Sequence, residues 1–112
     1  LGIQPTVSLS VDGGEATQVR VGEPVQLTGQ VVAPPGGTAV TGLAWDFTGN
    51  GQFEEAEATL GAKQAAVTAT HSFDQPGTYF VGLRVISQRT EYAGTPYGQL
   101  INLGRVRVTV TD

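Results

Sequence analysis

The sequence predicts an all-β fold, an aligned β-sandwich of about seven short strands in two antiparallel sheets. Three observations lead to this prediction. Short segments alternate apolar and polar residues, which is the period of a half-buried strand. Turns rich in glycine and proline separate these segments, and the chain holds 16 Gly and 6 Pro in 112 residues. No segment keeps the apolar spacing of an amphipathic helix over three turns. A closed barrel is the alternative arrangement of the same strands.

In the first half of the chain, the alternation predicts four strands. The segment from Val7 to Val11 alternates aliphatic residues with serine until the turn Asp12-Gly13-Gly14. The turn Gly22-Glu23-Pro24 ends the next extended segment. The run Pro34-Pro35-Gly36-Gly37 must be a loop, because proline has no backbone N–H and fixes its own backbone. The strands expected here span residues 7–11, 17–21, 25–31 and 43–47.

The second half predicts three more strands, at residues 67–73, 79–85 and 106–110, and Ile101 and Leu103 could extend the last one. The segment 54–66 is rich in Ala and Glu and could hold one short helical turn. Residues 88–103 are expected to form a long loop between the last two strands. Arg105 and Arg107 are expected on the outward face of the last strand, where charge protects an exposed strand edge against pairing with another chain.

Two motifs in this pattern carry a family resemblance. One is Trp45-Asp46-Phe47 followed by two glycines, and the other comprises His71, Phe73, Pro76-Gly77, Tyr79, Val81, Leu83 and Val85. In this order they resemble the polycystic kidney disease (PKD) domain, and the resemblance runs from Val7 to Val110. It implies an immunoglobulin-like β-sandwich that serves as a non-catalytic module of cell-surface and secreted proteins. The Thr48-Gly49-Asn50-Gly51 turn and the long loop 88–103 depart from the usual family pattern.

Large side chains of this sandwich are expected between its two sheets. Trp45 falls on the strand where such folds commonly bury a tryptophan. Tyr79 stands near the start of the penultimate strand, where its hydroxyl can bond back to the backbone as a tyrosine corner. The alternation therefore predicts that Trp45, Tyr79, Leu83 and Val85 are buried together.

Composition excludes several classes of function. The formal net charge is -4, so no broad basic surface is available for nucleic acid or an anionic membrane. The chain has no cysteine, which excludes a disulfide framework and a thiolate metal site. It shows no membrane-spanning apolar run and no signal peptide. We expect a monomeric single domain, residues 1–112, taken from a larger multidomain protein and located outside the cell, on its surface or in the periplasm.

The sequence gives little support for catalysis. Its only histidine is His71, which shares a strand face with Val67, Ala69 and Phe73 and is interpreted as a hydrogen-bonded structural residue at the edge of the core. No Gly-x-Ser-x-Gly or His-Glu-x-x-His motif occurs. We therefore expect that the chain is not an enzyme.

A calcium site is the one cofactor hypothesis that the residues suggest. Asp46, Asn50 and Glu54 place oxygen ligands along a short turn, and Glu55 or Asp74 could complete the site. The alternative is that the Asp and Asn side chains bind local backbone amides, while the turn glycines adopt positive φ. Thr48 and Gln52 stand where a calcium loop would carry acidic residues, which favours the alternative.

Two aromatic residues outside the alternating pattern are candidates for binding. Tyr92 and Tyr97 lie in the loop 88–103, and exposed rings of this kind stack on sugars or anchor protein interfaces. The alternative is that both rings fold back over the end of the sandwich and keep the loop ordered.

Three hypotheses for function remain open at this point. The first is a spacer that presents neighbouring domains of the same polypeptide and makes protein or carbohydrate contacts. The second is a carbohydrate-binding module that directs a secreted hydrolase to a polysaccharide. The third is a subdomain that completes the rim of a neighbouring enzyme's active site. A planar row of exposed aromatic rings would favour the second hypothesis, and a polar surface without such a row would favour the first.

Overall fold

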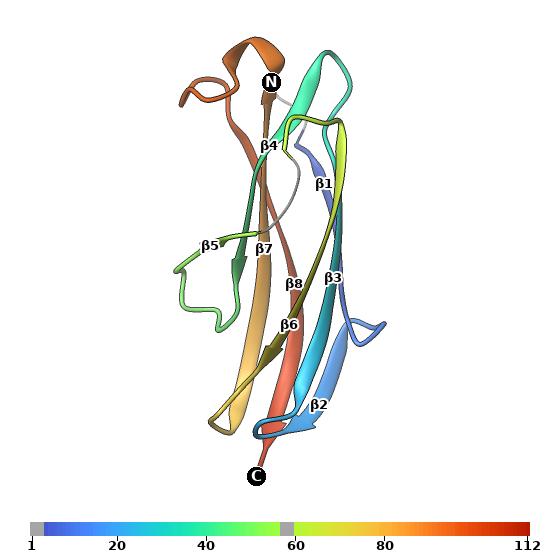
Figure 1. The fold of residues 1–112 in the computed structure, drawn as a ribbon, viewed down its shortest axis with the longest axis vertical. Helices are drawn as coiled ribbons and strands as arrows, with labels where there is room; N and C mark the ends of the chain where they lie inside the picture. The colour runs from blue at the N-terminus through green and yellow to red at the C-terminus, as the bar shows by residue number, and fades with distance from the viewer. Residues whose placement is uncertain (1–3, 57–59) are drawn as a thin grey trace.

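The structure is a computed structural model that describes residues 4–56 and 60–112. These residues form eight strands and one short 3₁₀ turn, η1 (Figure 1). The elements are β1 (Thr6–Val11), β2 (Ala16–Arg20), β3 (Pro24–Val32), β4 (Thr38–Asp46), β5 (Glu54–Glu55), β6 (Gln64–Ser72), β7 (Gly77–Arg89), η1 (Thr90–Tyr92) and β8 (Leu100–Thr111).

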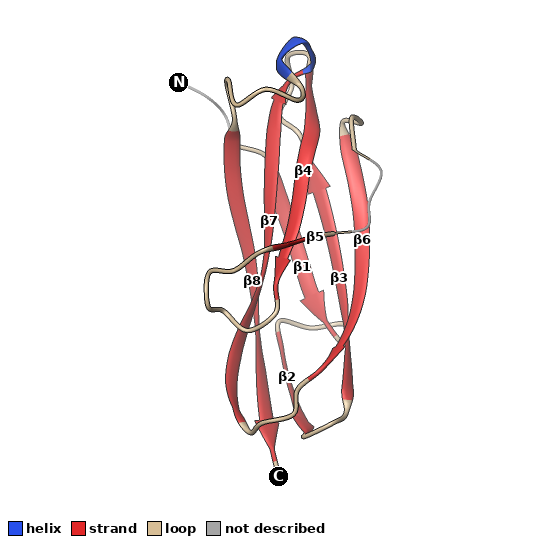
Figure 2. Cartoon of the chain, turned by 60° about the vertical axis from the view of Figure 1, so that its left-hand side comes forward, coloured by secondary structure: helices blue, strands red, loops and turns tan. Residues whose placement is uncertain are grey.

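The strands form two sheets packed face to face, which confirms the immunoglobulin-like β-sandwich (Figure 2). One sheet has the order β1-β3-β6 and is antiparallel throughout. The other has the order β2-β8-β7-β4-β5. Its β2–β8 pair is parallel, so the prediction of two antiparallel sheets is wrong for this pair. The reason is that the chain crosses from one sheet to the other at the turn after Val11, and β2 then runs alongside β8.

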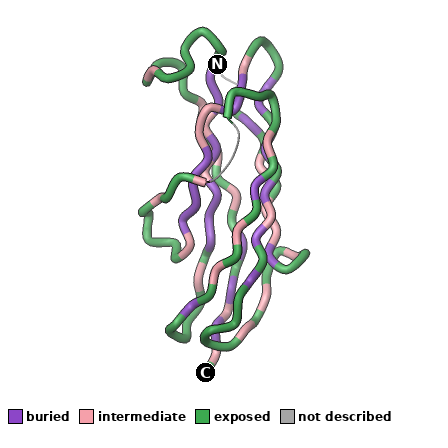
Figure 3. Tube along the Cα trace, in the orientation of Figure 1, coloured by how far each residue is buried: buried purple, intermediate pink, exposed green. Residues whose placement is uncertain are grey.

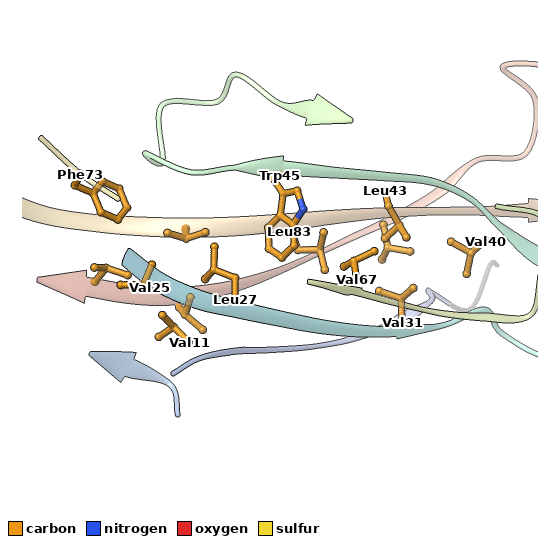
Figure 4. Packing of buried hydrophobic residues seen from close by; sticks show 14 of the residues in the cluster. Val11, Val25, Leu27, Val31, Val40, Leu43, Trp45, Val67, Phe73 and Leu83 are labelled. Atoms are coloured by element: carbon orange, nitrogen blue, oxygen red, sulfur yellow. The ribbon is translucent and has the colours of Figure 1, made fainter. Parts of the chain in front are cut away.

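Strict alternation places the core between the sheets. Along β3, every second residue from Val25 to Val31 is buried and the residues between them are half-buried or exposed (Figure 3). The core cluster draws on both sheets and includes Val11, Val25, Leu27, Val31, Val40, Leu43, Trp45, Val67, Phe73, Val81, Leu83, Val85, Val106, Val108 and Val110. Trp45 points from β4 into this layer, with Leu27 and Val67 of the opposite sheet facing it (Figure 4).

The predicted burial is confirmed for Trp45, Leu83 and Val85, whose side chains are 4%, 0% and 0% exposed. It is wrong in degree for Tyr79, which is half-buried and packs against the edge of the core. The Tyr79 hydroxyl donates a hydrogen bond to the Gln75 carbonyl at 2.9 Å. Tyr79 therefore makes the backbone contact expected of a tyrosine corner, and its hydroxyl can reach the carbonyl because the ring lies at the edge of the sandwich.

Strands β7 and β8 are longer than the sequence predicted. They pair from Gly77 with Val110 to Ser87 with Leu100, so Ile101 and Leu103 belong to β8. The loop expected over 88–103 therefore shortens to residues 90–99. The alternation was underestimated because the outer positions of this hairpin carry apolar residues such as Ile86, Ile101 and Leu103, which blur the contrast between its two faces.

Two further expectations need correction. The helical turn considered for 54–66 is not observed at Glu54–Glu55 or from Gln64 onward, where the chain is strand, and residues 57–59 lie outside the described residues. The expected exposed edge at Arg105 and Arg107 is also wrong from position 107 onward, because β8 lies inside its sheet and pairs with β2 from Arg107 to Thr111. Both arginines do lie on the outward face.

Within the described part of the chain, no helix has the length and apolar character needed to cross a membrane.

Candidate functional site

Two loops fold back over the outer face of the five-stranded sheet, and each covers one buried polar side chain. Asp46 ends β4 and is 6% exposed, and Gln88 lies near the end of β7 and is 2% exposed. We call residues 47–53 the Asp46 turn and residues 90–99 the Gln88 loop. Both buried side chains occupy outward positions of their strands, and such positions face solvent unless other chain covers them.

The Asp46 carboxylate organises its turn by accepting backbone hydrogen bonds. Its Oδ1 accepts from the N–H groups of Gly49 at 2.9 Å and Asn50 at 3.3 Å, and its Oδ2 accepts from Gly51 at 2.8 Å. The two glycines have φ of 79° and 86°, a conformation that side chains rarely adopt. A Cβ at Gly49 would also lie 2.9 Å from the Phe80 carbonyl oxygen. The turn therefore needs both the carboxylate and the glycines.

Two of the three residues proposed for calcium, Asp46 and Asn50, thus hold the turn itself. Asn50 Oδ1 accepts a hydrogen bond from the Gln52 N–H at 3.0 Å, and Glu54 lies exposed on β5. Among the described residues, no group of three or more His, Asp or Glu side chains lies close enough together to hold a metal ion. Calcium binding by Asp46, Asn50 and Glu54 stays a prediction.

Gln88 organises its loop by donating hydrogen bonds. The two N–H groups of its Nε2 are shared among the carbonyl oxygens of Tyr92, Thr95 and Tyr97, which lie at 3.1, 2.8 and 2.8 Å. Its Oε1 accepts from the Thr41 hydroxyl at 2.6 Å. Thr41 lies where the register between β4 and β7 shifts, between Val40 and Gly42. This irregularity in β4 therefore supplies the partner that fixes the Gln88 amide.

The two loop tyrosines lie on the outside of the Gln88 loop. Their carbonyls point inward to Gln88, while the residues are 41% exposed at Tyr92 and 67% exposed at Tyr97. Within the loop, the Tyr92 ring lies beside Gly98, where an added Cβ would meet it at 3.5 Å. The hydrogen bonds that tie this loop to Gln88 are therefore made by its backbone carbonyls.

At the edge of the sandwich, His71 belongs to a continuous chain of aromatic rings. Its ring stacks on Phe47 with centroids 4.4 Å apart, and meets the Phe73 ring edge-on at 4.7 Å. Trp45 stacks on Phe47, and Tyr79 stacks on Phe73, to extend the chain in both directions. Burial lowers the pKa of His71, and the nearby Glu54 carboxylate opposes this by raising it. The structural role inferred for His71 thus rests on ring stacking rather than on the expected hydrogen bond.

A groove of about 520 Å³ opens on the outer face of the five-stranded sheet, beside the Asp46 turn. Gly82 lies between its walls, and a Cβ there would meet only the Gly104 carbonyl at 3.7 Å and the Asp46 Cβ at 3.9 Å. The remaining lining residues are Asp46, Gly49, Gly51, Phe53, Phe80, Leu103 and Arg105. The guanidinium of Arg84 lies over the Phe53 ring, 4.4 Å from its centroid.

Sequence reasoning missed Gln88 and this groove. Gln88 was assigned to the start of a loop, and no local pattern marks a glutamine whose partners are carbonyl groups four to nine residues ahead. The groove did leave a signal. Phe80 stands among the outward positions of the 79–85 strand, next to Gly82, and a large ring beside a glycine on an outer face indicates a hollow.

The chain was compared with known protein families and with curated proteins. The family model described as the PKD domain matches residues 8–92, which is most of the chain. The search of the curated proteins gave no significant match.

Proposed function

The chain belongs to the PKD domain family, and from this premise we propose that it acts as a spacer that holds neighbouring domains of one extracellular polypeptide apart. PKD domains are generally non-catalytic, typically extracellular immunoglobulin-like modules. The proposal adds a specific role to that general one.

The observation that carries the proposal is the placement of the two chain ends. The domain measures 49 × 24 × 23 Å, and the start of β1 lies toward the opposite end of the long axis from the end of β8 (Figures 1 and 2). A polypeptide that enters next to β1 therefore leaves after β8 at the far end. Any domains joined there would be separated by most of the length of β8.

The sandwich has the continuity that a rigid spacer needs. The antiparallel pairing of β7 with β8 runs without interruption from Gly77 to Ser87. The Gln4 side chain donates to the Ile101 carbonyl at 3.2 Å, and the Asn102 side chain donates to the Pro5 carbonyl at 2.9 Å. These contacts tie the entering segment to β8 at the point where the sandwich begins.

Because the chain has no cysteine, single cysteines can be introduced for distance measurements by spin labelling. Labels at Thr6→Cys and Thr111→Cys should give one narrow distance distribution at about 30 Å, the rise of β8 from Asn102, which contacts Pro5, to Thr111 at roughly 3.3 Å per residue. Labels at Thr6→Cys and Glu91→Cys, which lie at the same end, should give a much shorter distance and serve as the control. A broad distribution for the first pair would contradict a rigid spacer.

Carbohydrate binding through Tyr92 and Tyr97 is the second candidate, because both rings are exposed on a loop with a fixed backbone. The exposed aromatic residues do not form a planar row, since Phe80 lies about 33 Å from the loop along β7 at the usual rise per residue. Replacing both tyrosines with alanine should leave the denaturant midpoint nearly unchanged. If the parent domain is retained on insoluble polysaccharide and the double variant is not, carbohydrate binding replaces the spacer as the primary function.

A further inference from the structure

The outer face of the β7–β8 hairpin concentrates positive charge in an otherwise acidic protein. These two strands carry four of the six basic residues and no Asp or Glu. Arg84, Arg105 and Arg107 occupy outward positions at successive paired sites of the hairpin. Within residues 4–56 and 60–112, the one ion pair joins Arg89 to Glu91, at the end of β7 away from this face. Among the described residues, the three outward arginines therefore form no ion pair, although Glu15 lines a neighbouring hollow with Arg105 and Arg107.

The same face exposes large apolar side chains. Phe80 is 51% exposed, Ile101 44% and Leu103 41%, and all three lie on outward positions of β7 or β8. The groove over Gly82 lies between Phe53 and Phe80, with Leu103 and Arg105 on its β8 side. Aromatic rings and arginine around an apolar hollow are the residue types that dominate the energetics of protein–protein interfaces.

We propose that this groove is a docking site for an acidic protein segment, one that carries carboxylates beside a large apolar side chain. The apolar side chain would enter the hollow over Gly82. The carboxylates would then meet Arg105 and Arg84, whose guanidinium is already positioned over the Phe53 ring. The Asp46 carboxylate lines the groove, but its oxygens accept three backbone hydrogen bonds and its charge is directed into the turn.

The surface chemistry favours a protein segment over a polysaccharide. Sugar sites present flat aromatic platforms and hydrogen-bonding side chains, whereas two of the three most exposed apolar residues on this face are aliphatic. Apart from Asp46, whose oxygens are already bonded, and Arg105, the lining of the groove offers glycines, two phenylalanines and a leucine. Such a lining buries an apolar side chain well and satisfies few hydroxyl groups.

The proposal can be tested with the isotopically labelled domain and a short synthetic peptide, acetyl-Gly-Asp-Glu-Leu-Phe-Asp-Glu-Gly-amide. Titration should shift backbone amide resonances within residues 49–53, 80–84 and 103–107 and leave the Gln88 loop unchanged. The matched peptide with Asn and Gln in place of Asp and Glu should bind at least tenfold more weakly. Raising the salt concentration should weaken binding of the acidic peptide, because the contacts are partly exposed.

Three variants separate the groove from general electrostatics. Arg105→Gln and Phe80→Ser alter exposed side chains and should each weaken binding about tenfold, while Gly82→Ala adds a Cβ to the groove without a close contact and should also weaken it. Arg89→Gln removes the same charge outside the groove and should bind like the parent. Melting curves establish that each variant is folded.

Several results would overturn the proposal. These are equal binding of the acidic and the neutral peptide, an equal loss in Arg89→Gln and Arg105→Gln, or no resonance shift at millimolar peptide. Polygalacturonate shifting the same resonances where the peptide does not would assign the groove to an acidic polysaccharide instead. None of these results bears on the distance between the two chain ends, so the spacer function is tested separately.

Discussion

The Asp46 turn and the Gln88 loop solve the same structural problem with opposite chemistry. Each covers a polar side chain on the outer face of the five-stranded sheet, and each is held by that side chain rather than by packing in the core. Asp46 is charged and accepts bonds from backbone N–H groups that converge in a tight turn. Gln88 is neutral and donates to carbonyl oxygens spread over a wider loop. The difference shows which buried side chain each loop needs. A loop whose N–H groups point inward needs an acceptor such as Asp46, and a loop whose carbonyl groups point inward needs a donor such as Gln88.

Replacing the donor at Gln88 with an acceptor should lower the unfolding free energy more than any other change considered for these two loops. In Gln88→Glu, a carboxylate oxygen would replace the Nε2 donor and face three carbonyl oxygens. An uncompensated buried charge of this kind costs about 3–5 kcal/mol of unfolding free energy. Chemical denaturation at neutral pH measures the loss, and Gln99→Glu, an exposed position in the same loop, is the control.

The destabilisation in Gln88→Glu should also depend on pH. The native environment raises the pKa of the introduced carboxyl above its unfolded value, because a protonated carboxyl can again donate to a carbonyl. The cost is therefore present in full above the native pKa and disappears as the pH falls below the unfolded pKa of about 4.3. A cost that stays constant down to that pH would show that the Gln88 donor does not hold the loop.

The reciprocal exchange at Asp46 should have a smaller effect. In Asp46→Asn, one oxygen acceptor remains and one or two backbone N–H groups lose their partner. Because the turn is close to solvent, water can satisfy part of this loss, and we expect a cost of about 1–2 kcal/mol. Asp74→Asn makes the same change at an exposed position and should be nearly neutral. If Asp46→Asn lowered the unfolding free energy as much as Gln88→Glu, the two loops would not differ in how strongly they depend on their buried side chains.

At the edge of the sandwich near the Asp46 turn, His71 provides a weaker test based on pH. Burial holds the pKa of native His71 below the unfolded value of about 6.5, despite the opposing Glu54 charge. The unfolded chain therefore binds a proton at a higher pH than the native domain does. Stability is full above the unfolded pKa and falls as the pH drops toward the lowered native pKa. In His71→Phe, which keeps the stack, this slope between pH 7 and pH 6 should vanish.

Adding calcium should have the smallest effect on the stability of the domain. If the Asp46 oxygens are committed to three backbone N–H groups, calcium cannot bind there without dismantling the turn. We therefore expect the same melting temperature in chelator and in calcium on the order of 1 mM, the range of weak extracellular sites. A rise that is lost in Glu54→Gln but kept in Glu91→Gln would restore the predicted site at Asp46, Asn50 and Glu54.

The sequence was sufficient for the sandwich, the burial of Trp45 and the local turn at Asp46, since each depends on residues close together in the chain. The alternation of apolar and polar residues is visible in neighbouring positions. An aspartate shortly before two glycines indicates a turn in which the carboxylate accepts hydrogen bonds from backbone N–H groups.

Features that depend on distant residues were missed. The parallel β2–β8 pair joins segments some ninety residues apart, and nothing in residues 16–20 indicates which strand they will join. The Gln88 amide depends on an irregularity in β4 that presents Thr41 to it. The docking groove exists because the Asp46 turn, β7 and β8 meet over Gly82. Each is a product of the folded arrangement.

The position of β8 has a consequence for how the domain is made. β8 is the last strand of the chain, yet it lies between β2 and β7 and completes most of the five-stranded sheet. During synthesis, the first seven strands leave the ribosome while β2 still has no partner in its sheet. Folding can finish only after residues 100–111 emerge, when synthesis of any following domain is already under way. In a multidomain protein, this module would complete its fold alongside a neighbour that is still unfolded.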